Sequence, residues 1–179
     1  MARRGGSRTT HAPLVELTTA TPEETQAFGQ RLGRLLRPGD VVAFYGELGS
    51  GKTTLIQGLA QGLGSDPERV KSPTFVLLRE YRGPTPIIHI DGYRLEGAPA
   101  VAWLDTDLIF SPSKVTLIEW AERFEGLLPP AHVALRLSHV STNRRRILLE
   151  AVGQPGDRFQ ELKSADAPSG EAAQAEGSE

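Results

Sequence analysis

The chain has 179 residues, of which 39% are hydrophobic and 23% charged, and this suits one globular domain with a sizeable core. The absence of cysteine excludes a disulfide scaffold, a cysteine-ligated zinc site and a thiol nucleophile. No apolar run reaches the roughly 18 residues of a membrane helix, and no signal-peptide segment follows the basic start, so we expect a soluble cytoplasmic protein without membrane contact.

Charge is spread unevenly along the chain. The formal net charge of -2 combines a basic start, residues 1–13, with an acidic end, residues 153–179, that holds six acidic and two basic residues. Both ends are rich in Gly, Ser, Ala and charge, which predicts disorder there and leaves residues 14–152 as the folded domain. That body is close to neutral, unlike a stand-alone nucleic-acid-binding domain, which usually carries a basic surface.

The first predicted elements are a helix, a strand and a second helix. Thr21 is a suitable N-cap with Glu24 three residues later, so a helix is expected to begin there. The continuous apolar run at residues 41–45 is typical of a strand buried on both faces. Apolar residues at helical spacing over residues 55–63 predict another helix, which ends near Gly64.

Several strands are predicted in the second half of the chain. Their expected ranges are residues 74–78, 86–90, 115–118, 132–138 and 144–152. The second of these ends at Asp91 and the third at Glu119. The last two flank a Ser-Thr-Asn turn, which predicts an antiparallel hairpin. Residues 96–114 are ambiguous, although their apolar spacing allows a short helix.

A phosphate-binding loop is the clearest motif. Residues 46–53 match G-x-x-x-x-G-K-[ST] at every constrained position, after a predicted strand and at the start of a predicted helix. Glycines allow backbone N–H groups to approach a polyphosphate, and a helix N-terminus favours anions. Lys52 would contact the β and γ phosphates, and the Thr53 hydroxyl would bind magnesium. The alternative, a Gly-rich turn with an incidental lysine, fits this context less well.

The motif and the strand pattern together predict the fold class. We expect an α/β fold, with a mixed β-sheet flanked by helices as in P-loop NTPases, in a single domain with a C-terminal antiparallel hairpin. The predicted phosphate-binding residues are Gly46, Glu47, Leu48, Gly49, Ser50, Gly51, Lys52 and Thr53.

Two carboxylates are candidates to complete the site. Asp91 and Glu119 each follow a hydrophobic strand, and the C-terminal strand ends of an open α/β sheet face the ligand crevice. One would hold the metal and the other would position water, and the sequence leaves open which does which. The alternative is that either one caps a turn or pairs with Arg94. Residues 72–75 are either a switch segment that senses the γ-phosphate or an ordinary turn.

Other notable residues have ordinary structural interpretations. Trp120 either stacks on a base or fills the core, and His89, inside a strand, is expected to be a packed histidine. The arginines at 144–146 either touch a phosphate backbone or protect a solvated hairpin edge, and we favour the edge. With four dispersed histidines and no cysteine, no transition-metal cluster is expected.

Four sequence blocks together resemble the bacterial TsaE family, formerly YjeE. They are GELGSGKTT at residues 46–54, SPTF at 72–75, HIDGYRL at 89–95 and LIEW at 117–120, and the resemblance covers about residues 14–150. It implies a magnesium-dependent ATPase, weak alone, that is required for threonylcarbamoyladenosine beside the anticodon of tRNA. It also implies action on the TsaB–TsaD complex, which makes the modification, so that tRNA is engaged only indirectly.

The resemblance also implies roles for individual residues. Lys52 would contact phosphates, Thr53 and Glu119 would hold Mg²⁺, and Asp91 would serve catalysis together with Lys52 and Glu119. The implied nucleotide-binding set adds Thr54, Thr74 in the switch segment and Trp120 to the loop residues. Gly92 stands where the family has a bulkier residue, which we expect to loosen the turn after Asp91.

Three other functions stay open. A small-molecule P-loop kinase usually has an arginine-rich lid, whereas residues 92–114 hold only Arg94 and Lys114 as basic residues. A nucleotide-dependent scaffold that binds ATP but barely hydrolyses it would carry the same carboxylates. Direct RNA binding through the basic start and residues 144–146 would weaken steeply with salt.

Overall fold

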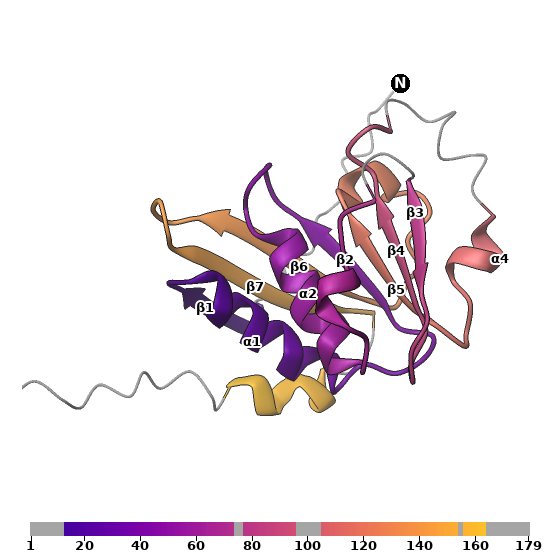
Figure 1. Cartoon of the computed structure of the whole chain (residues 1–179), viewed down its shortest axis with the longest axis horizontal. Coiled ribbons are helices and arrows are strands. Elements are labelled where there is room, and N and C mark those ends of the chain that lie inside the picture. The colour runs from indigo at the N-terminus through magenta and orange to yellow at the C-terminus, as the bar shows by residue number, and fades with distance from the viewer. Residues whose placement is uncertain (1–12, 74–76, 96–104, 154–155, 164–179) are drawn as a thin grey trace, which may run out of the picture.

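The computed structural model describes residues 13–73, 77–95, 105–153 and 156–163, which form a single α/β domain on one seven-stranded sheet (Figure 1). The strand order is β1-β7-β6-β2-β5-β4-β3. The strands are β1 (Val15–Thr19), β2 (Val41–Tyr45), β3 (Leu78–Tyr81), β4 (Ile87–Asp91), β5 (Val115–Glu119), β6 (His132–His139) and β7 (Arg145–Val152). The central pairs are parallel and the outer pairs antiparallel, which confirms the predicted mixed sheet and the C-terminal hairpin β6–β7.

The helices are short. They are α1 (Pro22–Gly33), α2 (Lys52–Gly62), α4 (Thr106–Ile109) and the 3-10 helices η1 (Pro67–Arg69), η2 (Ala121–Phe124) and η3 (Asp157–Lys163). α1 begins as predicted, because the Thr21 hydroxyl accepts from the Glu24 N–H at 3.2 Å and the Glu24 carboxylate accepts from the Ala20 N–H at 2.7 Å. Among the described residues, no helix has the length and apolarity to cross a bilayer.

The two faces of the sheet are covered unequally (Figure 1). α1, α2 and η3 pack on one face, whereas η2 and α4 cover the other face over β2, β4 and β5. β4 and β5 are therefore buried at every residue, which explains their continuous apolar sequences. β6 buries Val133, Leu135 and Leu137 and exposes Arg136 and Ser138, as the alternation predicts, whereas Ala134 is buried as well.

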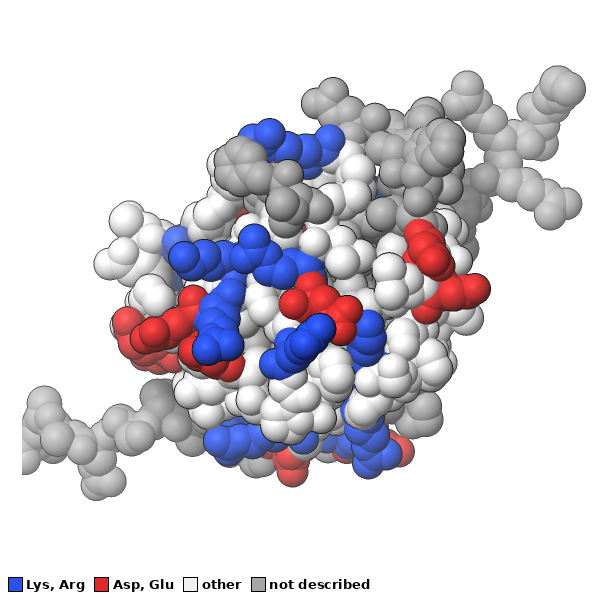
Figure 2. Space-filling model, turned by 45° about the vertical axis from the view of Figure 1, so that its right-hand side comes forward, with Lys and Arg blue, Asp and Glu red and all other residues white. Residues whose placement is uncertain are grey.

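Charges of both signs are mixed around the edge strand β3. Arg79, Glu80 and Arg82 are exposed there, and Lys114 donates to Glu80 at 3.0 Å. Figure 2 shows basic and acidic side chains interspersed on this side of the molecule. Among the described residues, this face therefore lacks the continuous basic surface typical of a stand-alone nucleic-acid-binding domain.

Two strand predictions need correction. The sequence prediction omits β1, whose alternation spans only five residues, and it places a strand at residues 74–78. Leu77 has a left-handed φ of 66°, so β3 begins only at Leu78; residues 74–76 lie outside the described part of the chain. α4 falls within the ambiguous stretch, of which residues 96–104 likewise lie outside the described part.

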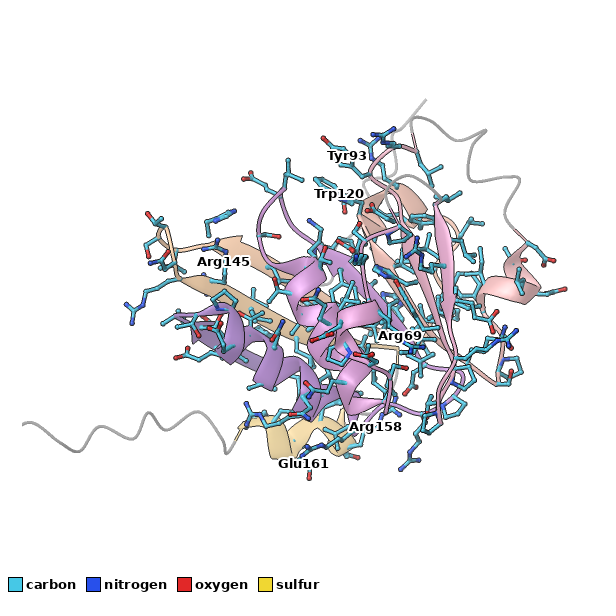
Figure 3. The ribbon with its side chains drawn as sticks, in the orientation of Figure 1. Arg69, Tyr93, Trp120, Arg145, Arg158 and Glu161 are labelled. Atoms are coloured by element: carbon cyan, nitrogen blue, oxygen red, sulfur yellow. The ribbon has the colours of Figure 1, made fainter. Side chains whose placement is uncertain are left out.

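The segment after β7 also differs from the prediction. The prediction of a disordered tail from residue 153 is wrong for η3. Phe159 and Leu162 are 0% and 2% exposed and belong to the main core. Arg158 donates to both carboxylate oxygens of Asp40 at 2.8 and 2.7 Å, which ties η3 to the turn before β2 (Figure 3). Two apolar side chains among many polar ones are too few to predict this packing from sequence.

Glycines allow α1 and α2 to cross with their backbones in contact. A Cβ atom on Gly58 would lie 2.1 Å from the carbonyl oxygen of Gln26, and one on Gly29 would lie 2.5 Å from that of Leu55. The Gln26 side chain also donates to the Gln57 side-chain oxygen at 3.1 Å across the same crossing. The start of α2, and with it the phosphate loop, is thereby held against α1.

We predict that Gly58→Ala destabilises the protein by about 2 kcal/mol, because the added methyl group forces the helix backbones apart. Helix propensity alone would favour alanine by about 1 kcal/mol, so the sign of the effect tests the close crossing. The measurement is urea unfolding, with Gly126→Ala as control because a Cβ there meets no atom within 4 Å. A Gly58→Ala variant as stable as the wild type would contradict the crossing.

Candidate functional site

The phosphate loop connects β2 to α2. Gly51 precedes the first residue of α2 with a left-handed φ of 100°, a conformation that favours glycine. A Cβ on Gly46 would lie 2.4 Å from the carbonyl oxygen of Leu137, so the loop packs directly on the backbone of β6. The buried Ser50 N–H donates to the Glu47 carbonyl at 3.2 Å. The loop is thus a fixed turn that opens onto a helix N-terminus, as the motif predicts.

Lys52 places a largely buried ammonium group against the loop. It is 5% exposed, and its Nζ donates to the carbonyls of Gly46 and Glu47 at 2.8 and 2.9 Å. The same Nζ lies 4.2 Å from the centroid of the Trp120 ring. Burial lowers the pKa of Lys52, and the negative charges of Glu119 and other nearby acids partly oppose this shift. A cation with few water contacts is strongly attracted to an arriving anion.

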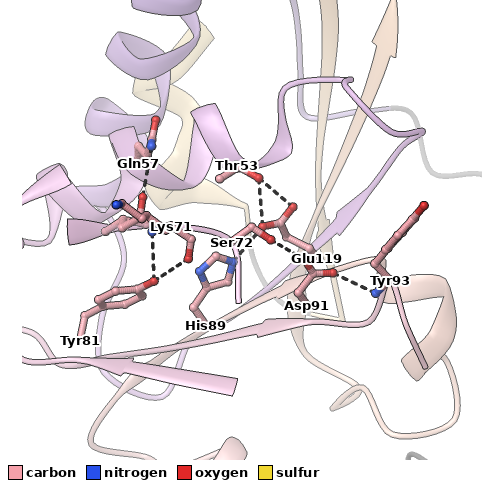
Figure 4. Close-up of polar contacts among 10 residues, drawn as sticks. Thr53, Gln57, Lys71, Ser72, Tyr81, His89, Asp91, Tyr93 and Glu119 are labelled. Atoms are coloured by element: carbon pink, nitrogen blue, oxygen red, sulfur yellow. Dashed lines mark hydrogen bonds and ion pairs between the residues drawn. The ribbon is translucent and has the colours of Figure 1, made fainter. Parts of the chain in front are cut away.

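The two predicted carboxylates lie side by side at the ends of β4 and β5 (Figure 4). Glu119 has its two oxygens 3.2 and 3.3 Å from the Thr53 hydroxyl. Asp91 accepts from the Ser72 hydroxyl and, at 2.9 Å, from the Tyr93 N–H. Both acids are 3% exposed. The structure therefore brings the start of α2 to Glu119, and the segment that precedes residues 74–76 to Asp91.

The Thr53 hydroxyl and the Glu119 carboxylate fit a magnesium ion. Both supply hard oxygen ligands, and Mg²⁺ at nucleotide sites usually takes one or two carboxylates together with substrate phosphates and waters. Within the described residues no group of three or more His, Cys, Asp or Glu side chains could hold a metal ion. A metal site made by protein side chains alone is not seen there, whereas a site shared with a nucleotide agrees with this donor set.

Trp120 lies beside the loop and not in the core. Its ring covers Lys52 and contacts the Tyr93 ring, with centroids 5.2 Å apart and planes inclined by 48° (Figure 3). Its φ of 58° is uncommon for a residue other than glycine. Tyr93 is 43% exposed and Trp120 is partly exposed. Of the two interpretations left open by the sequence, core packing is excluded.

Gly92 forms a tight turn between Asp91 and Tyr93. Its N–H donates to the Glu119 carbonyl at 3.0 Å, and a Cβ there would lie 2.6 Å from the Phe124 ring. The expectation that Gly92 loosens this turn is therefore wrong. The absence of a side chain lets the turn pack closely against η2 and keeps Asp91 and Glu119 together.

A cavity of about 420 Å³ adjoins the loop. It lies between the start of α1, the loop and the β6–β7 turn, and its lining includes Thr21, Glu23, Thr54, Asn143 and Arg145. Volumes of roughly 300–1,000 Å³ are typical of small-molecule sites. The cavity thus offers space for a compact organic group next to the phosphate loop.

The arginines of the β6–β7 turn have partners within the chain. Arg145 donates to the carbonyls of Ser141 and Thr142 at 3.2 and 3.0 Å, and the Arg146 Nε donates to Glu16 at 2.8 Å. These contacts favour the interpretation of residues 144–146 as a charged hairpin edge.

Comparison with known proteins decides the family. The family described as "Threonylcarbamoyl adenosine biosynthesis protein TsaE" matches residues 19–147. The chain belongs to the TsaE family. A relative from Bacillus subtilis (strain 168), named tRNA threonylcarbamoyladenosine biosynthesis protein TsaE, is 38% identical over 136 residues, which cover 75% of this chain and 84% of the relative. A relative of the same name from Treponema pallidum (strain Nichols) is 37% identical over 125 residues, which cover 70% and 92%.

A solved structure supports the same assignment. The crystal structure of Bacillus subtilis YdiB matches with a TM-score of 0.69 at 32% identity, over 86% of this chain and 96% of that chain. The resemblance inferred from the four sequence blocks is confirmed. The chain is thus a TsaE component of threonylcarbamoyladenosine biosynthesis for tRNA.

The residues implied by TsaE membership are only partly covered by the structure. Lys52, Thr53, Asp91, Glu119 and Trp120 converge at the loop, whereas Thr74 lies outside the described residues. Sequence reasoning missed one polar contact of the site, because His89 was expected only to pack. Its Nε2 lies 2.9 Å from Glu119 Oε1. The available signal was its place two residues before Asp91, since alternate residues of a strand share a face.

Lys52 also predicts a pH dependence of stability. Because burial lowers its pKa, the folded protein loses this proton at a lower pH than the unfolded chain, whose lysine titrates near 10.5. Between these two pKa values the unfolded chain binds more protons, so the folded state gains stability as pH rises. The wild type should therefore gain stability relative to Lys52→Met as the pH rises towards 10.5 in urea unfolding without nucleotide. A constant difference, or a change of opposite sign, would contradict the lowered pKa.

Proposed function

We propose that this TsaE family member binds ATP with Mg²⁺ at residues 46–53 and hydrolyses it. The observation that supports this most is the convergence of Lys52 and Thr53, at the start of α2, with Asp91 and Glu119, at the ends of adjacent parallel strands. A phosphate loop, a metal-binding hydroxyl and strand-end carboxylates are the parts that phosphoryl transfer requires.

Each side chain takes a role that follows from its contacts. Lys52 exchanges the carbonyls of Gly46 and Glu47 for phosphate oxygens. Glu119 holds the metal with Thr53, because the two already touch. When bound, Mg²⁺ neutralises charge on the β and γ phosphates. Asp91, joined to Ser72 just before the proposed switch residue Thr74, orients the attacking water.

The nucleoside occupies the cavity beside the loop. Its volume of about 420 Å³ suits a base and a ribose, and Thr54 joins its lining to the first turn of α2. Trp120 lies on the other side, over Lys52, where its ring shields the phosphates from water. These placements agree with the nucleotide-binding residues that family membership implies.

The partners are the TsaB and TsaD proteins, through which tRNA is engaged indirectly in the cytoplasm. Leu48 in the loop is 71% exposed and Tyr93 beside Trp120 is 43% exposed, so two large apolar side chains beside the site are accessible to a partner. In the isolated protein the site is open to water, and in the complex the partners cover it. We therefore expect hydrolysis to be weak without the partners.

Nucleotide affinity tests the first part of this proposal. Lys52→Ala should weaken ADP binding in the presence of Mg²⁺ about 100-fold, because each charge-assisted hydrogen bond to a phosphate is worth roughly 1.5–3 kcal/mol. Isothermal titration measures the change. Lys114→Ala, which removes a lysine paired with Glu80 on the surface, is the matched control and should bind ADP as the wild type does. Equal affinity of Lys52→Ala and wild type would refute the phosphate contact.

Hydrolysis with partners tests the second part. Phosphate release in single-turnover assays should rise at least tenfold when TsaB and TsaD are added, by analogy with partner-completed phosphoryl-transfer sites. Tyr93→Ala should lower this stimulation, whereas Leu108→Ala, an exposed apolar residue on α4, should not. ATP binding without phosphate release would favour the scaffold, and a phosphorylated metabolite would favour the kinase. Strong, salt-sensitive binding of tRNA to the isolated protein would instead favour direct RNA binding.

A further inference from the structure

His89 is a buried polar side chain that has no role in the proposed binding and hydrolysis of ATP. It lies on β4 two residues before Asp91 and is 0% exposed. Its Nε2 is 2.9 Å from Glu119 Oε1, across the parallel pair β4–β5 (Figure 4). The Tyr81 ring lies next to it, with centroids 6.1 Å apart, and the Tyr81 hydroxyl is occupied by the backbone of Lys71.

The hydrogen bond has a defined direction. A carboxylate oxygen accepts hydrogen bonds, so the tautomer that fits this contact has its proton on Nε2 and donates a hydrogen bond to Glu119. The other ring nitrogen, Nδ1, is buried without a hydrogen-bond partner among the described residues. A buried polar atom without a partner is unfavourable. An apolar residue at position 89 would avoid that penalty, so packing alone does not account for a histidine here.

We propose that His89 is a positioning residue, which fixes the Glu119 carboxylate in the orientation that receives Mg²⁺ together with the nucleotide; this rests on the proposed function. Glu119 is held at Oε1 by His89, while the Thr53 hydroxyl lies within 3.3 Å of both oxygens. Turning the carboxylate away from Thr53 would break the hydrogen bond to His89. His89 therefore reduces the rotamer freedom that Glu119 loses when the metal binds.

The burial of the pair strengthens this constraint. The side chains of His89 and Glu119 are 0% and 4% exposed, so water has little access to compete for the hydrogen bond. Outer contacts of this kind typically change metal affinity or activity 10–100-fold when removed. The Nε2 of His89 contacts Glu119 and its Nδ1 has no hydrogen-bond partner, so among the described residues His89 makes no hydrogen bond to the phosphate loop or to Lys52. The effect of His89 on ADP affinity should therefore appear only when Mg²⁺ is present.

The test compares ADP affinity in EDTA with ADP affinity in Mg²⁺, by isothermal titration. In wild type, Mg²⁺ should tighten binding, and in Glu119→Ala this gain should disappear. His89→Leu, which keeps bulk but lacks the N–H group, should reduce the Mg²⁺-dependent gain about tenfold and change affinity in EDTA less than about twofold. His89→Gln, whose amide nitrogen lies at about the reach of Nε2, should keep most of the gain.

Thr116→Val is the matched control. Thr116 is a buried polar residue on the same strand as Glu119, and its hydroxyl donates to the Ile109 carbonyl on the opposite face of the sheet. Loss of this hydroxyl should lower the thermal midpoint of unfolding but leave the Mg²⁺-dependent gain in ADP affinity unchanged.

Several results would overturn the inference. One is a His89→Leu variant with the full Mg²⁺-dependent gain, and another is an equal loss of affinity with and without Mg²⁺, which would indicate a purely structural role. If His89→Leu does not fold, His89→Asn replaces it, because its shorter amide does not reach Glu119. Equal gains in His89→Asn and His89→Gln would then refute the inference. Wild-type protein that binds no ADP would refute the proposed function itself, and the His89 role with it.

Discussion

Parallel pairing of β5 with both β2 and β4 is the constraint on which the site depends. The register sets Asp91 beside Glu119, and the pairing of β2 with β5 makes the loop after β2 emerge next to them. Because β5 is bonded on both sides and buried at every residue, its register cannot slip without moving side chains to the wrong face. The distance between the carboxylates and the loop is thus a property of the sheet, and not of flexible side chains.

The helix crossing supplies the other half of this geometry. Glycines bring α1 and α2 into backbone contact, so the first turn of α2 is held by the core and not only by its own hydrogen bonds. Lys52 is then fixed where its charge is costly in the absence of an anion, as its lowered pKa indicates. A protein that places a cation in such a position gives up stability in the free state for attraction in the bound state.

Much of this arrangement could be predicted from the sequence, because strong local signals coincide with it. The glycine spacing determines the loop, and continuous apolar runs determine β2, β4 and β5. Local sequence patterns do not predict the contact of Thr53 with Glu119, since it joins residues 66 positions apart and depends on register; only the family resemblance, which assigns both residues to Mg²⁺, implies that they lie close together. His89 gave no signal beyond its strand position. β1 and η3 were missed because their apolar residues are few, and only burial against distant strands stabilises them.

The aromatic ring over Lys52 has a practical consequence. The chain contains two tryptophans, and the one at position 120 lies 4.2 Å from the ammonium nitrogen that phosphates would attract. Indole emission responds to nearby charge, so any movement of that ammonium changes the electric field at the ring. The protein therefore carries its own optical reporter beside the proposed phosphate site, and binding at that site can be followed in real time without an attached dye.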